Sequence, residues 1–179
     1  GYVKDDEKLD PDELLKSLKE QNEAAADERK RLNLPPLQLV GWAVPPHYDA
    51  ATRRLEWGTK LLSGSGQYGV NYTVRILGRS GVMNAILVTT PETLLTDLQE
   101  FRTALNGYDF VAGQRYAEFK QGDKVAEYGL AALIIGGAAA AAAKSGIFKV
   151  LGKFAGVIGV AVIGAVGVFF RKFFKRKAA

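Results

Sequence analysis

The residues best suited to chemistry lie in one short stretch, which combines aromatic rings, prolines, an imidazole and a carboxylate. The stretch contains Trp42, Pro45, Pro46, His47, Tyr48 and Asp49. His47 is the only histidine in the chain, and there is no cysteine. A metal site built from several imidazoles or thiolates is therefore excluded, and a nucleophile–histidine–carboxylate relay would have to use His47. We expect neither a metal nor a cofactor.

Two interpretations of this stretch are open. As a functional cluster, it is a loop whose aromatic rings and imidazole grip a partner. As a structural feature, it is a proline-rich turn in which Trp42 and Tyr48 plug the end of a sheet and Asp49 caps the next turn. We favour the structural interpretation, and no Gly-x-Ser-x-Gly nucleophile elbow is present.

Glu56, Arg75 and Arg79 form a second candidate group. They lie in or beside predicted strands, so we expect them to make cross-strand ion pairs at a hairpin rather than a clamp for a substrate. The nearby sequence Gly-Arg-Ser-Gly at residues 78–81 lacks the Gly-Lys-Ser/Thr ending of a phosphate-binding loop, and no helix follows it. We therefore expect a hairpin turn there.

Periodicity predicts the elements that position these residues. Residues 10–32 begin with an Asp-Pro-Asp-Glu capping pattern and continue as an amphipathic helix. Apolar and strand-forming residues predict four strands, over residues 37–44, 52–62, 70–77 and 82–89. Residues 90–105 predict a second helix. Strands joined by short connections indicate an antiparallel meander sheet with flanking helices, so the fold class of residues 1–122 is α+β.

Charge is distributed unevenly along the chain. The sequence has 24 Lys and Arg against 19 Asp and Glu, with a pI of about 9.4. Eight of the basic residues and no acidic residue lie beyond residue 143, so the rest of the chain is slightly acidic. The high pI therefore belongs to the C-terminal part, and we expect no nucleic-acid partner.

The C-terminal part is predicted to be a membrane anchor in the lipid bilayer. Residues 154–170 carry no charge, and as a helix they are roughly 26 Å long, which extension back to Ile147 brings to a full span. We predict a transmembrane helix over residues 147–171 and a basic tail over residues 172–179. Small residues that permit close helix packing, or simply reflect membrane-helix composition, are Gly152, Gly156, Gly159, Gly164 and Gly167.

An Ala/Gly-rich segment, residues 123–146, precedes the anchor. Its uncharged run over residues 128–143 is either a second membrane helix, which would make a helical hairpin, or a helix buried against protein. One crossing would place the domain and the basic tail on opposite sides of the membrane, and two would place them on the same side.

Several segments in sequence order are similar to a bacterial family of uncharacterised membrane-anchored proteins, a domain of unknown function. These segments are residues 1–6, 41–43, 45–49, 71–72, 75–81 and 123–130. The resemblance implies a longer precursor with a signal sequence and more of the domain ahead of Gly1. It places the domain outside the cytoplasm, in the periplasm, and it implies no catalytic residue. The basic residues at the far end of the span favour a cytoplasmic tail.

We therefore predict an extracytoplasmic domain tethered to the bacterial inner membrane. We expect it to act as a self-associating scaffold or as an accessory subunit of an envelope complex, with a homo-oligomeric or membrane-protein partner. The alternative is a hydrolase-like enzyme that uses His47 with Asp49 or another nearby carboxylate.

Overall fold

The computed structural model describes residues 1–136. In chain order its elements are α1 (Pro11–Ala24), α2 (Ala26–Arg31), β1 (Leu37–Asp49), β2 (Arg54–Ser63), β3 (Tyr68–Leu77), β4 (Val82–Thr89), α3 (Leu94–Leu105), the 3-10 helix η1 (Tyr116–Glu118) and α4 (Leu130–Ile135). The predicted transmembrane helix, its glycines and the basic tail lie outside these residues. Among the helices that are described, none has the length and apolar character needed to cross a bilayer.

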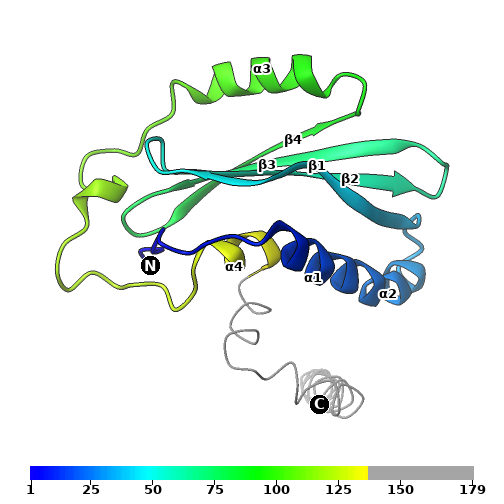
Figure 1. Cartoon of the computed structure of the whole chain (residues 1–179), viewed down its shortest axis with the longest axis horizontal. Coiled ribbons are helices and arrows are strands. Elements are labelled where there is room, and N and C mark those ends of the chain that lie inside the picture. The colour runs from blue at the N-terminus through cyan, green and yellow to red at the C-terminus, as the bar shows by residue number, and fades with distance from the viewer. Residues whose placement is uncertain (137–179) are drawn as a thin grey trace, which may run out of the picture. The chain divides into compact units, whose positions relative to one another are not determined.

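The strands form one antiparallel sheet in the order β1-β2-β3-β4, in which each strand pairs with its neighbours in sequence. Helix α3 lies over one face of the sheet, and α1 and α4 lie on the other side (Figure 1). We call these the α3 face and the α1/α4 face. The predicted meander and the α+β class are confirmed.

Each face of the sheet has its own hydrophobic core. The core on the α1/α4 face consists of Val3, Leu14, Leu55, Trp57, Leu77, Tyr116, Leu130, Leu133 and Ile134. The core on the α3 face consists of Tyr72, Val74, Ile76 and Leu98. Consecutive strand residues point to opposite faces, which is why Ile76 and Leu77 of β3 belong to different cores.

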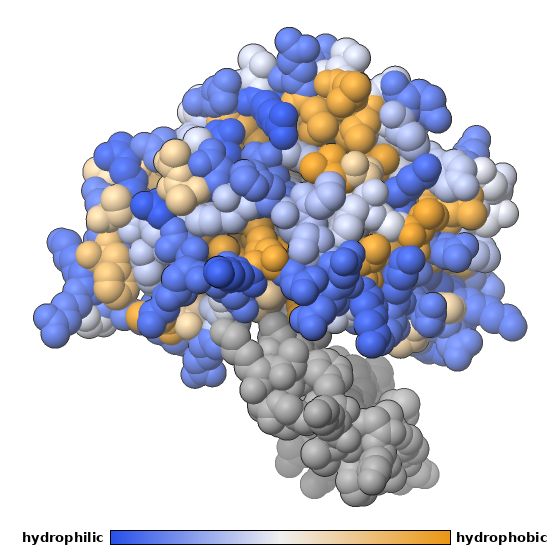
Figure 2. All heavy atoms as spheres, in the orientation of Figure 1, coloured by the Kyte–Doolittle hydropathy of each residue, from blue (hydrophilic) through white to orange (hydrophobic). Residues whose placement is uncertain are grey.

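The first predicted helix is present but divided. The Asp10 carboxylate accepts hydrogen bonds from the backbone N–H groups of Asp12 (3.0 Å) and Glu13 (3.1 Å), so the predicted N-cap is formed. The helix is interrupted at Ala25, where α1 ends and the short α2 begins. In Figure 2, hydrophilic side chains dominate the surface over these two helices.

The strand that carries the candidate stretch is longer than predicted. We expected a turn after residue 44, but β1 continues through Pro45 and Pro46 to Asp49, and this prediction was wrong. The reason is that β1 is an edge strand, where a residue without an N–H group is tolerated on the side that has no neighbour. Its pairing with β2 shifts register three times along its length.

The two ends of the described domain meet beside α4. Tyr2 forms a parallel bridge with Val125, and the Glu7 carboxylate accepts a hydrogen bond from the N–H of Ala131 (3.0 Å) in the first turn of α4. The apolar residues of α4 are buried in the core of the α1/α4 face. This part of the predicted segment 123–146 therefore packs against protein, and its remainder from residue 137 lies outside the described residues.

Candidate functional site

The predicted stretch in β1 does not form one cluster, because its side chains divide between the two faces of the sheet. The indole Nε1 of Trp42 donates to the carbonyl of Pro11 (2.9 Å), and the Tyr48 hydroxyl donates to the Asp5 carboxylate (2.7 Å). Both side chains thus lie on the α1/α4 face, where they hold the N-terminal segment. His47 alternates with Tyr48 and lies on the α3 face, exposed to solvent.

The carboxylates nearest in sequence or register to His47 are engaged elsewhere. Glu56, opposite His47 in the β1–β2 pairing, accepts hydrogen bonds from the Tyr72 hydroxyl and from Arg102 (3.2 Å). Asp49 accepts two hydrogen bonds, at 2.8 and 2.9 Å, from the turn that follows it. Within residues 1–136, His47 has no hydrogen bond to a carboxylate, so the relay that the hydrolase alternative needs is not assembled.

The network around Glu56 attaches α3 to the sheet. Arg102 of α3 donates to the Tyr72 hydroxyl (3.0 Å) as well as to Glu56. Burial, together with the hydrogen bond to Glu56, raises the pKa of Tyr72 to about 12, so this phenol stays neutral. Sequence reasoning missed Arg102, because a helix position 46 residues away gives no local signal of its partner in β2.

The predicted ion-pair cluster of Glu56, Arg75 and Arg79 is not formed, which corrects our expectation. Glu56 is opposite Val74 in the sheet and therefore lies on the α3 face, whereas Arg75 lies on the α1/α4 face. Arg79, in the hairpin turn, pairs instead with Asp123 at 2.6 and 2.7 Å. Glu56 and Arg75 were expected on one face, but the register of β2 with β3 places them on opposite faces.

A polar hollow of about 420 Å³ at the end of β2 and β3 is lined by three arginines. All three guanidinium groups are bonded: Arg53 to Asp5 (2.5 Å), Arg54 to the carbonyl of Leu105 (2.8 Å) and Arg115 to Asp109 (2.7 Å). The first bond joins the segment before α1 to the turn before β2, the second joins the end of α3 to β2, and the third lies within the loop between α3 and η1. The hollow is therefore built mainly as a structural junction.

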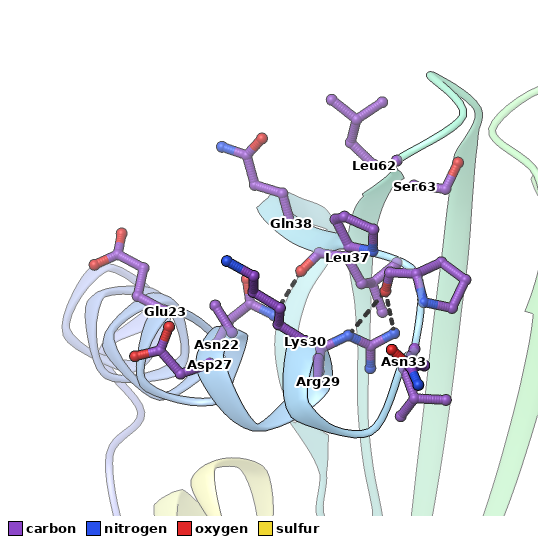
Figure 3. A pocket seen from close by; sticks show the side chains of 15 residues that line it. Asn22, Glu23, Asp27, Arg29, Lys30, Asn33, Leu37, Gln38, Leu62 and Ser63 are labelled. Atoms are coloured by element: carbon purple, nitrogen blue, oxygen red, sulfur yellow. Dashed lines mark hydrogen bonds between the residues drawn. The ribbon is translucent and has the colours of Figure 1, made fainter.

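A larger hollow, of about 900 Å³, lies between α2 and the adjoining ends of β1 and β2 (Figure 3). We call it the α2 groove. Its apolar wall consists of Ala26, Leu34, Pro35, Pro36, Leu37 and Leu62. Charged side chains of the helices, Glu23, Asp27, Arg29 and Lys30, also line it. The lining thus combines an apolar wall with a charged border along the helices.

Polar side chains fix the walls of the α2 groove. The Asn22 amide donates to the carbonyl of Leu37 (3.1 Å) and accepts from the N–H of Leu39 (2.9 Å). The Arg29 guanidinium donates twice to the carbonyl of Pro35, at 3.1 and 2.8 Å (Figure 3). The groove was not predicted from the sequence, because α2 and the ends of β1 and β2 come together only in the folded chain.

Comparison with known families covers almost the whole chain. A family profile described as a protein of unknown function (DUF2167) matches residues 1–167. The chain belongs to the DUF2167 family. The predicted resemblance to an uncharacterised family is thereby confirmed. No curated protein and no solved structure matches the chain. The match includes every described residue, so the sheet, both cores and the α2 groove all lie within the DUF2167 domain.

Proposed function

We propose that this chain is a membrane-tethered, non-enzymatic binding domain. In this proposal the domain lies on the periplasmic side of the bacterial inner membrane and the basic tail on the cytoplasmic side. It serves as a self-associating scaffold or as an accessory subunit of an envelope complex, and the α2 groove takes an apolar segment of a partner protein.

The observation that carries the binding role is the character of the α2 groove. Its wall is lined by leucine and proline side chains, and Asn22 and Arg29 are bonded to the backbone of the wall. A partner's apolar segment would therefore bury hydrophobic surface without displacing internal hydrogen bonds, which favours association. The charged side chains of the groove lie along the helices at its border, and the apolar wall carries no charged group.

The observation that supports the tether is the sequence of the C-terminal part. Residues 147–170 contain only two charges, both in the first turns, and they are long enough to span a ~30 Å hydrocarbon core. Aromatic and basic residues alternate at the far end, a pattern that favours the membrane interface on the cytoplasmic side.

The tether can be tested by flotation of the purified full chain with phospholipid vesicles in a density gradient. We expect the full chain to float with the vesicles after a high-salt, alkaline wash. A chain without residues 147–179 should remain at the bottom, while a control chain without residues 172–179 should still float. Release of the full chain by the wash would reject the tether.

The side of the membrane needs a separate test. In cells of the source bacterium, protease added outside spheroplasts should digest the domain, and protection of the domain would reject the periplasmic placement.

Two neighbouring leucines allow a matched test of the α2 groove. Leu34 lines the groove, whereas Leu32 does not, although both side chains are about half exposed. We expect the full chain to cross-link to a partner protein in membranes, and we expect Leu34→Glu to abolish this cross-link, because a buried carboxylate opposes apolar contact. Leu32→Glu should leave it in place. Equal cross-linking of both variants would show that the groove is not the binding surface.

The alternative, a hydrolase-like enzyme using His47, has no specific observation in its favour. The imidazole is exposed, and the nearby carboxylates of Glu56 and Asp49 are bonded to other groups. Catalysis by such a relay requires a base oriented by a carboxylate within hydrogen-bond distance.

A further inference from the structure

Within residues 1–136, strand β4 has a bare edge. Its sequence, residues 82–89, contains no charged residue and no proline, and its pairing with β3 keeps one register along all eight residues. No backbone group of β4 bonds to any described segment other than β3. Edge strands in natural proteins are normally blunted by charges, prolines or bulges, because unpaired N–H and C=O groups invite another strand.

The opposite edge of the same sheet has the usual protection. In β1, the Asn22 amide occupies the backbone groups of Leu37 and Leu39, and α1 lies alongside the strand. Pro45 and Pro46 remove donors farther along, and three register shifts bend the strand. In the described part of the chain, the β1 edge is therefore protected against pairing with another strand and the β4 edge is not.

One face of β4 is also uncovered beyond Val82, which packs against the core of the α1/α4 face. On the α3 face, Met83 and Leu87 pack against the core beneath α3. On the α1/α4 face, Ile86 is 54% exposed and Val88 is 74% exposed. A strand with an open backbone edge and adjoining exposed apolar side chains can bury both by pairing with another strand.

We propose that the edge of β4 pairs antiparallel with β4 of a second copy, so that two domains share one continuous eight-stranded sheet. This inference rests on the self-association in the proposed function and identifies its surface. A two-fold axis relates identical strands in antiparallel orientation, which is the geometry that the edge of an antiparallel sheet accepts. Because β4 is uncharged, two copies meet without like-charge repulsion.

The proposed register places the two-fold axis at Ile86. The Ile86 side chains of the two copies then lie opposite each other on the α1/α4 face, and Val88 of each copy lies opposite Asn84 of the other. This register pairs seven of the residues in β4 and brings the exposed apolar side chains of both copies into one strip. In this register the length, charge and apolar positions of the two strands match because the strands are identical.

The absence of cysteine from the chain makes a direct test possible. In the full chain in detergent, we expect Ile86→Cys to form a disulfide-linked dimer under mild oxidation, because directly opposed residues in antiparallel strands have Cα atoms about 4.5–5.5 Å apart, within the range that a disulfide bridges. Two controls, Val40→Cys on β1 and Leu95→Cys on α3, replace other exposed apolar residues and should remain monomeric on denaturing gels. Equal dimer yields from all three variants, or none from Ile86→Cys, would overturn the proposal.

A second variant separates this surface from the membrane anchor. We expect Ile86→Lys/Val88→Lys to raise the dissociation constant of the detergent-solubilised dimer at least about tenfold, because four ammonium groups would meet across the axis. Leu95→Lys is the control, and circular dichroism verifies that each variant is folded. A dimer that persists in Ile86→Lys/Val88→Lys but is lost without residues 147–179 would overturn the β4 surface and leave self-association intact.

Two further outcomes are decisive. A monomeric full chain would overturn both the β4 surface and self-association. An Ile86→Cys adduct with a different protein would overturn the second copy as the occupant of the β4 edge.

Discussion

Asp123 shows how individual charged residues hold this domain together. Its carboxylate accepts two hydrogen bonds from the Arg79 guanidinium and one from the backbone N–H of Lys120 (2.8 Å). Arg79 also donates to the carbonyl of Gly113 (3.2 Å), so one arginine joins the β3–β4 turn to two later loops. The bonds from Arg79 and then from Lys120 lower the pKa of Asp123 from 3.8 to about 2.

Replacing Asp123 by Asn tests this bond through its pH dependence. Because the fold favours the ionised carboxylate, the stabilisation is complete above the unfolded-state pKa and is lost as the pH falls from about 4 to about 2. We expect Asp123→Asn to have a lower urea midpoint than the unchanged chain near neutral pH, and the two midpoints to converge in acid. The control, Asp109→Asn, removes the exposed pair with Arg115 and should have a smaller effect. A midpoint difference independent of pH would contradict the assignment.

At the scale of elements, the edge of β1 depends on a side chain from α1. The Asn22 amide supplies one donor and one acceptor to β1, as a neighbouring strand would. It thereby connects the helix to the sheet and closes one wall of the α2 groove. Loss of this amide would leave two backbone groups without partners at a half-buried position.

We predict that Asn22→Ala lowers the free energy of unfolding by about 1–3 kcal/mol, because two hydrogen bonds are lost and their backbone partners remain partly buried. Equilibrium unfolding in urea measures the change. Glu23→Ala is a suitable control, since this neighbouring side chain is exposed. Equal stability of the two variants would mean that water replaces the amide at the β1 edge without cost.

Local signals predicted the regular elements well. Strand β4 has the expected bounds, and α3 ends at Leu105 as expected but begins at Leu94, four residues later than predicted. Alternation and helical periodicity are visible within a few residues, whereas the exact start of a helix is not. The extension of β1 through Pro45 and Pro46 could not be predicted in this way. Proline is compatible with a strand only when the strand is at an edge, and edge position depends on which strands pair.

The candidate sites were less predictable than the fold for the same reason. Trp42 and Tyr48 bond to Pro11, at the start of α1, and to Asp5, before it, and both partners are distant in the sequence. The pairing of Arg79 with Asp123 likewise spans 44 residues. Contacts of this kind depend on how the elements assemble, and they leave no local pattern in a single sequence from which they could be predicted.

At the scale of the whole described domain, the N-terminal segment is part of the fold. The Tyr2 ring lies between those of Tyr116 and Phe119, with ring centroids 4.4 and 4.3 Å away. Its backbone exchanges hydrogen bonds with Lys124 and Ala126 (2.8 and 2.7 Å), and Val3 beside it is buried. The first residues therefore complete the core that the sheet and α4 begin.

We predict that Tyr2→Ala lowers the free energy of unfolding by about 2–4 kcal/mol, because two aromatic contacts and a half-buried ring are lost. Thermal and urea unfolding measure the effect. Tyr68→Ala, at a more exposed ring on β3, serves as the control and should cost less. Matching losses in the two variants would show that the N-terminal segment contributes little to the core.

The bond from the Tyr116 hydroxyl to the carbonyl of Val3 (2.9 Å) joins residues 113 positions apart. Synthesis on the ribosome proceeds at about 5–20 residues per second, so Tyr116 is synthesised on the order of ten seconds after Val3. The meander pairs neighbouring strands and can form during that interval, whereas the α1/α4 core cannot close. We therefore expect nascent chains to pass through a state in which the α1/α4 face of the sheet is accessible to chaperones until α4 has emerged from the ribosome.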